Sequence, residues 1–188
     1  MTHTNPWQSL RRVITGTDNN GRSKIMIDDH LPNRHMFDDF SGLHEVWTDP
    51  GNPLDRTASK DQTERNISIA PERGAVRFRY FTVAPTPKIS EQITEAMVRE
   101  QVADAFASVN SAHHQQDTSR HAAMHITPTI DCIVLLQGRV KLILDDEETE
   151  LKPFDMVIQR GTNHAWEVIG EEPALFVAVL VDREFLNK

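Results

Sequence analysis

The sequence predicts an all-β fold with one helix, on three observations. From residue 121 onward, short runs rich in β-branched and aromatic residues alternate with turn residues. A similar run lies at 75–83, and the segment 11–29 is typical of a hairpin around an Asp-Asn-Asn-Gly turn. The stretch 90–109 instead carries apolar residues at helical spacing. Antiparallel strands this close together in sequence indicate a closed barrel or sandwich with a peripheral helix.

The chain length of 188 residues is sufficient for one domain with a sizeable core. We expect a single domain over 1–188. Its parts are N-terminal strands and loops in 1–89, an insertion of helix and loop in 90–120, and the core strands in 121–182.

Charge and cysteine content restrict the partners and the compartment. The formal net charge of −8 argues against nucleic acid and anionic membranes as main partners. No stretch approaches the roughly 18 apolar residues of a membrane span. The single cysteine, Cys132, excludes an internal disulfide and favours a cytoplasmic location. Because Cys132 follows Asp131, it should face the opposite side of its strand, as a buried, inert thiol.

The N-terminal half should contribute several strands. Arg11–Thr15 and Ser23–Ile27 form the expected hairpin, Leu43–Trp47 is a further candidate, and 75–83 alternates so that Arg77 and Arg79 share one face. Two interpretations of this arginine pair remain open. An inward arginine would bind a ligand carboxylate with both arms of its guanidinium, whereas outward arginines would be solvated.

The segment 90–109 is the predicted helix. Ser90 is a suitable N-cap, and an apolar stripe follows at helical spacing. The stripe contains Val98, Val102, Ala105, Phe106 and Val109. We expect this helix to pack on the outside of the barrel, the alternatives being a pocket lid or a dimer contact.

The C-terminal third is expected to be β throughout and to build a pocket. The predicted strands cover 131–137, 139–144, 156–160, 164–169 and 174–182. If Asp131 points inward, the two-residue period of a strand also points Ile133 inward. The same argument links His164 with Trp166. The resulting wall is largely apolar with polar groups at one end, which is the usual composition of a small-molecule site.

The residues 124–168 resemble two sequence motifs of the cupin family of small β-barrels. The first motif usually reads G-x5-H-x-H-x3,4-E-x6-G. Here its positions are held by His125, Thr127, Asp131 and Gly138. The second motif usually reads G-x5-P-x-G-x2-H-x3-N. Its G-x2-H element is present as Gly161-Thr162-Asn163-His164, with Gln159 at the proline position and Val168 at the asparagine position. The chain resembles a subgroup whose core reads M-H-x-T-x-T-x-D followed by Q-R-G-T-x-H-A-W, to which no secure activity is attached.

The resemblance implies a double-stranded β-helix, a jelly-roll barrel with one open end. In this family the motif residues point inward to a divalent metal such as iron, manganese, nickel, cobalt or zinc. Family activities include dioxygenases, isomerases, decarboxylases, lyases and epimerases, besides sugar binders and storage proteins. The fold alone therefore selects no function.

His125, Asp131 and His164 are the candidate metal ligands. Two imidazoles and one carboxylate suit non-haem iron(II) and also zinc or manganese. The alternative is a metal-free, hydrogen-bonded polar cluster, because Thr127 replaces one histidine and aspartate is one methylene shorter than glutamate. His121, four residues before His125, would partly replace the missing ligand, although a surface position is the simpler expectation.

Two functional hypotheses follow. The first is a metal-dependent enzyme acting on a small carboxylated or aromatic metabolite, and the second is a metal-free binding or sensor protein. Six residues are the candidate pocket lining: Thr127, Ile133, Trp166, Gln159, Arg77 and Arg79. Trp166 would stack on a planar ligand or belong to the core. The expected partners are a small-molecule ligand and a second copy of the chain, paired through the edges of Arg11–Ile27 and Ala75–Val83.

Overall fold

The computed structural model describes residues 9–53, 55–57, 60–63 and 67–186, and it confirms the predicted all-β fold with one α-helix. The helices are α1 (Glu95–Ser108) and a short 3-10 helix, η2 (Ala112–His114). The strands are β1 (Arg11–Thr17), β2 (Ser23–His30), β3 (Arg34–Met36), β4 (Gly42–Asp49), β5 (Val76–Val83), β6 (Thr129–Gln137), β7 (Val140–Ile143), β8 (Glu148–Leu151), β9 (Met156–Arg160), β10 (Ala165–Val168) and β11 (Ala174–Asp182). Among the described residues, no helix is long and apolar enough to cross a membrane.

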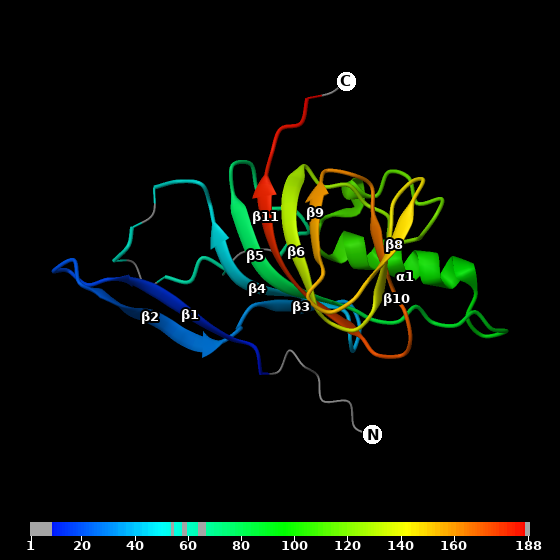
Figure 1. Ribbon diagram of the computed structural model, residues 1–188, viewed down its shortest axis with the longest axis horizontal. Coiled ribbons are helices and arrows are strands. Elements are labelled where there is room, and N and C mark those ends of the chain that lie inside the picture. The colour runs from blue at the N-terminus through cyan, green and yellow to red at the C-terminus, as the bar shows by residue number, and fades with distance from the viewer. Residues whose placement is uncertain (1–8, 54, 58–59, 64–66, 187–188) are drawn as a thin grey trace.

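Two antiparallel sheets form the barrel, and a separate hairpin extends from it (Figure 1). The larger sheet has the strand order β3-β4-β5-β11-β6-β9, and the smaller has the order β10-β7-β8. β1 and β2 pair with each other. The strands that are central in the large sheet come from both ends of the sequence, as a jelly-roll barrel requires.

The core lies between the inner faces of the two sheets. Phe176, Leu135 and Val140 are almost completely buried there, and Trp166 packs among them. These residues occupy alternate positions of their strands, so the inner face of each strand is apolar while the next residue points away. The apolar wall predicted from the alternation on β6 and β10 is therefore present.

The helix starts later than Ser90. Its N-cap is Thr94, whose hydroxyl accepts a hydrogen bond from the backbone N–H of Met97. Ser90 instead accepts hydrogen bonds from the N–H groups of Gln92 and Ile93 in the preceding turn. Both residues are typical N-caps, and the sequence offered no means of choosing between them.

Two expectations about outward positions were wrong. Cys132 faces away from Asp131, as expected, but it is exposed rather than buried, because no other described element covers that side of the sheet. The segment predicted as an edge at 75–83 is β5, an interior strand between β4 and β11. The edges of the large sheet are β3 and β9.

Candidate functional site

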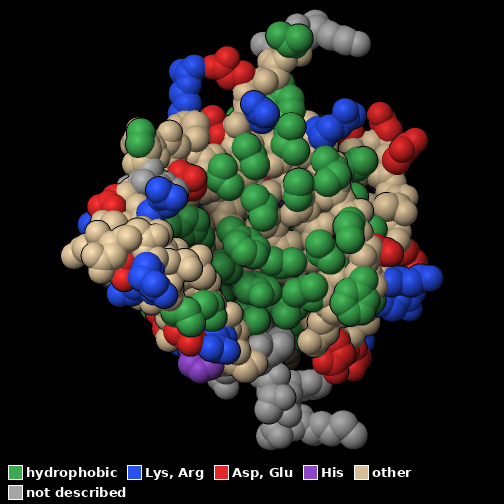
Figure 2. Space-filling model, turned by 60° about the vertical axis from the view of Figure 1, so that its left-hand side comes forward, with side chains coloured by type: hydrophobic (Ala, Val, Ile, Leu, Met, Phe, Trp, Pro, Cys, Tyr) green, Lys and Arg blue, Asp and Glu red, His purple; other side chains and the backbone are tan. Residues whose placement is uncertain are grey.

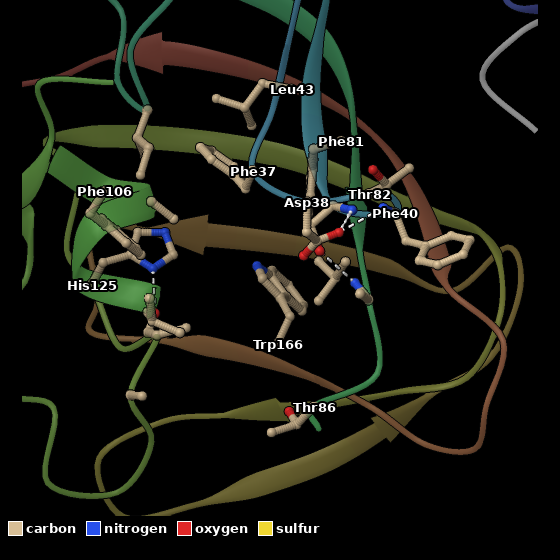
Figure 3. A pocket seen from close by; sticks show the side chains of 18 of the residues that line it. Phe37, Asp38, Phe40, Leu43, Phe81, Thr82, Thr86, Phe106, His125 and Trp166 are labelled. Carbon is tan, nitrogen blue, oxygen red and sulfur yellow. Dashed lines mark hydrogen bonds between the residues drawn. The ribbon is translucent and has the colours of Figure 1, made fainter. Parts of the chain in front are cut away.

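The open end of the barrel contains a pocket of about 490 Å³. Its floor and walls come from the inner faces of β5, β6, β10 and β11, and its lining is mainly apolar. Figure 3 shows Phe106 beside His125, with the rings of Phe37, Phe81 and Trp166 around the same space. The volume lies within the usual range for small-molecule sites, about 300–1,000 Å³.

His125 and His164 lie side by side in this pocket. Each backbone N–H donates to the other residue's carbonyl at 3.0 Å, which joins the two residues in an isolated antiparallel bridge. The ring centroids are 4.2 Å apart. Nδ1 of His125 contacts the carbonyl of Ala123, and Nδ1 of His164 contacts the carbonyl of Thr162, each at 2.9 Å. Because a carbonyl only accepts, both Nδ1 atoms carry the proton, and each Nε2 keeps a free lone pair.

The protein environment keeps both imidazoles neutral. Burial lowers the pKa of His125 to about 4, and the hydrogen bond to the Ala123 carbonyl only partly opposes this effect. Part of the His125 surface faces the pocket, yet the surrounding protein excludes most water. For His164, burial and the neighbouring His125 hold the pKa well below its ordinary value. At neutral pH the pair therefore presents two hydrogen-bond acceptors or two metal-ligand nitrogens.

Asp131 is the third polar group of the pocket. Its side chain points inward from β6, is only 4% exposed, and lines the pocket. Its Oδ1 atom has no hydrogen-bond partner in the part of the chain that the structure describes. Burial raises the pKa of Asp131 to about 6, although a hydrogen bond from Thr129 and the charge of Arg79 act in the opposite direction. A buried carboxylate oxygen without a hydrogen-bond partner costs free energy, which makes Oδ1 of Asp131 a candidate contact for a ligand.

The donor set does not fit a three-residue metal centre. Over the described residues, no group of three or more His, Cys, Asp or Glu side chains is placed to hold a metal ion. Thr127, which stands at a histidine position of the family motif, shares a 2.7 Å hydrogen bond with the hydroxyl of Thr129. The Asp131 side chain is one methylene shorter than the glutamate of the family motif, so its carboxylate reaches less far into the pocket. A metal on His125, Asp131 and His164 stays a prediction.

Arg77 and Arg79 both point into the protein. Arg79 donates from Nη2 to Glu45 Oε1 at 2.6 Å, and Arg77 Nε lies 3.8 Å from Glu45 Oε2. Both guanidiniums also donate to the backbone carbonyl of Ser68 at 2.7 Å. The interpretation of solvated arginines is therefore wrong, since their exposed fractions are 4% and 2%. The two arginines hold the loop around Ser68 in place, and both guanidiniums already lie against the Glu45 carboxylate.

The remaining predicted lining residues divide into two groups. Thr127, Ile133, Trp166 and Arg79 line the pocket. Arg77 and Gln159 lie outside its lining, and the Gln159 amide donates to the Thr162 carbonyl at 2.9 Å. Gln159 therefore supports the loop that carries His164.

Sequence reasoning missed the residues that form the mouth. The segments 37–41 and 84–87 line the pocket, and so do α1 residues of the predicted apolar stripe. The stripe residues concerned are Val98, Val102, Ala105 and Phe106. The helix thus contributes to the pocket lining, which is closer to the alternative of a pocket lid than to a helix packed only on the outside of the barrel. His121 also lines the pocket, and His114 is buried with Nδ1 2.8 Å from the carbonyl of Ile126.

Comparison with known proteins gives a family match for the C-terminal part of the chain. Residues 114–180 match the family model described as "Cupin domain". "Phomopsin biosynthesis cluster protein C'" and "Phomopsin biosynthesis cluster protein D" of Diaporthe leptostromiformis are each 50% identical over 44 residues, which are 23% of this chain and 23% of each relative. The match thus spans about a quarter of the length of these relatives.

Solved structures with a similar fold include two bacterial proteins. One is Rru_A2000 from Rhodospirillum rubrum, a cupin-2 domain, with 11% identity, coverage of 81% of this chain and 72% of that chain, and a TM-score of 0.43. The other is a Cupin 2 conserved barrel domain protein from Salinispora arenicola, with 14% identity, coverage of 76% of both chains, and a TM-score of 0.37.

A jelly-roll barrel with inward histidines at its open end defines a class of small β-barrel proteins with an internal pocket. The segment 114–180, which contains His125, Asp131 and His164, matches the cupin domain that the two sequence motifs resemble.

Proposed function

We propose that this barrel binds a small, largely apolar molecule that carries a hydroxyl group, and that it does so without a metal held by three protein ligands. The observation that carries the proposal is the buried Asp131 carboxylate on the pocket wall, whose Oδ1 lacks a partner among the described residues. A ligand hydroxyl would supply the missing hydrogen bond.

The other polar groups support the same ligand chemistry. His125 and His164 offer acceptor nitrogens, because each Nδ1–H is already directed at a carbonyl. Arg79 lines the pocket, but its Nη atoms are taken up by Glu45 and by backbone carbonyls. A ligand carboxylate would meet an ionised Asp131, and the charge of Arg79 is already paired with Glu45, so that only the Nε–H of Arg79 is without a partner among the described residues. This arrangement of charges favours a ligand hydroxyl over the carboxylated metabolite expected from the sequence.

Matched probes test this proposal. Naphthalene, 2-methoxynaphthalene, 2-naphthol and 2-naphthoate share one apolar body and differ in a single polar group. We expect 2-naphthol to bind about tenfold more tightly than the ether or the hydrocarbon, in buffer containing a chelator, since one good hydrogen bond to a charged group contributes about 1.5–3 kcal/mol. Binding is measured by titration calorimetry. Tightest binding by 2-naphthoate would contradict the proposal.

Two variants locate the binding. Val102→Trp on α1 places a large ring at the pocket lining and should abolish binding, whereas Ala103→Trp, at an exposed position of the same helix, should leave it unchanged. Asp131→Asn should reduce the preference for 2-naphthol over naphthalene without affecting naphthalene itself. Equal affinities for all four probes in the wild type would mean that the pocket is apolar only.

A metal-dependent enzyme is the second candidate function. It is favoured by the orientation of His125 and His164, because ligating histidines usually donate their other ring nitrogen to a carbonyl or carboxylate. A bound divalent metal would supply Lewis-acid or oxygen chemistry, and a third ligand would have to come from water or substrate. Metal analysis separates the two candidates.

A further inference from the structure

Over β5, β11, β6 and β9 the outer face of the large sheet is apolar, and among the described residues Cys132, Met156 and Ile158 are exposed there (Figure 2). Side chains alternate along each strand, so the neighbours of the buried inward residues point to this side. We call this surface the outer sheet face and define it by Val76, Phe78, Tyr80, Ile130, Cys132, Val134, Met156, Ile158, Val177, Val179 and Val181.

The strand register arranges these residues in rows across β5, β11, β6 and β9. One row contains Phe78, Val179, Cys132 and Ile158, and the next contains Tyr80, Val177, Val134 and Met156. Neither row contains a charged side chain on these four strands. The third row ends at a charge, since Arg160 on β9 lies opposite Ile130. The charges on these strands are therefore at the margin of the face.

The exposure of this face is unusual for a surface in water. Met156 is 76% exposed and Ile158 is 60% exposed. Four strands about 4.8 Å apart, each spanning five residues at about 3.3 Å per residue, give a projected area of roughly 300 Å². That area suits the apolar centre of an interface of about 800 Å² per partner, whose rim is polar.

We infer that two copies of this chain pack face to face through the outer sheet face. An uncharged surface can pack against a second copy of itself, because a two-fold axis brings no like charges together. Figure 1 shows α1 and the small sheet on the other side of the large sheet, so neither of them covers the outer sheet face. The predicted homodimer is thus assigned to this face rather than to a strand edge.

Paired lysine substitutions test the assignment. Met156→Lys with Ile158→Lys places four positive charges in the dimer interface but only exposed side chains in the monomer, so the fold is retained. Ile89→Lys with Met97→Lys is the matched control, since these residues are 60% and 52% exposed and lie elsewhere. By light scattering at about 50 μM we expect twice the chain mass of 21.4 kDa for the wild type and the control, and a single chain mass for the first variant. A monomeric wild type, or a dimeric first variant, would overturn the inference.

The reactivity of Cys132 identifies which surface is buried. The thiol lies in the centre of the outer sheet face and is exposed in the single chain. In the wild-type dimer we expect it to react with a disulfide reagent at least tenfold more slowly than in the Met156→Lys, Ile158→Lys variant. A dimeric wild type whose Cys132 reacts as fast as that of the variant would show that the copies pair through another surface.

Discussion

His125 and His164 are joined by two reciprocal backbone hydrogen bonds of 3.0 Å, although 39 residues separate them in sequence. The bridge fixes both rings at the open end of the barrel. Each ring is further oriented by its own Nδ1 contact with a carbonyl two residues before it. These backbone contacts fix the positions of both rings.

Replacing His164 by alanine tests whether the histidine pair depends on a bound metal. We expect the variant to fold and to lose about 1–3 kcal/mol of unfolding free energy, because a buried hydrogen bond is removed and the Thr162 carbonyl keeps only the Gln159 amide as a donor. The thermal midpoint should be insensitive to chelator in both the wild type and the variant. If chelator lowers the wild-type midpoint and leaves that of the variant unchanged, the site holds a structural metal.

The buried pair of Glu45 and Arg79 should be essential for stability. Glu45→Gln leaves Arg77 and Arg79 buried without their carboxylate partner, and we expect a loss of about 3–5 kcal/mol in urea unfolding. The matched control is Glu150→Gln, which breaks the exposed pair with Arg139 and should cost at most about 1 kcal/mol. Equal effects of the two substitutions would show that the buried cluster has no special role.

Acid should weaken the contact between Arg12 and Asp61. Burial alone would raise the pKa of Asp61, but hydrogen bonds from Arg12 and Thr63 outweigh it, so the pKa lies below its ordinary value. A lowered folded-state pKa means that this carboxylate stabilises the fold above the unfolded value of about 3.9 and that the stabilisation disappears as the pH falls further.

The stability difference between the wild type and Asp61→Asn should therefore be constant near neutral pH and should shrink below about pH 4. Unfolding free energies measured from pH 7 down to pH 2.5 check this. Asp28→Asn, which removes the exposed partner of Arg11, is the control and should change stability little at any pH. A difference that grows in acid would contradict the assignment.

Local patterns in the sequence predicted the barrel strands and the inward direction of Asp131, Ile133 and Trp166. Strand periodicity alone determines these directions once one residue of a strand is placed. β8 escaped prediction because its sequence, Glu-Thr-Glu-Leu, is mostly polar and only Leu151 is buried. Such a strand is stabilised by its partner β7 rather than by its own composition.

Contacts between distant segments were beyond sequence reasoning. Glu45 lies 34 residues before Arg79, and nothing near either residue indicates that they pair. The same holds for the pocket mouth, where 37–41 and 84–87 meet α1.

The metal content of the purified protein tests most directly whether the pocket works without a three-residue metal centre. The wild type is prepared without chelator and analysed for iron, manganese, nickel, cobalt and zinc by mass spectrometry of the elements. We expect far less than one ion per chain, and no rise of the thermal midpoint when any of these metals is added. One tightly held ion per chain that is lost in His164→Ala would contradict the proposed function and establish the metal-dependent alternative.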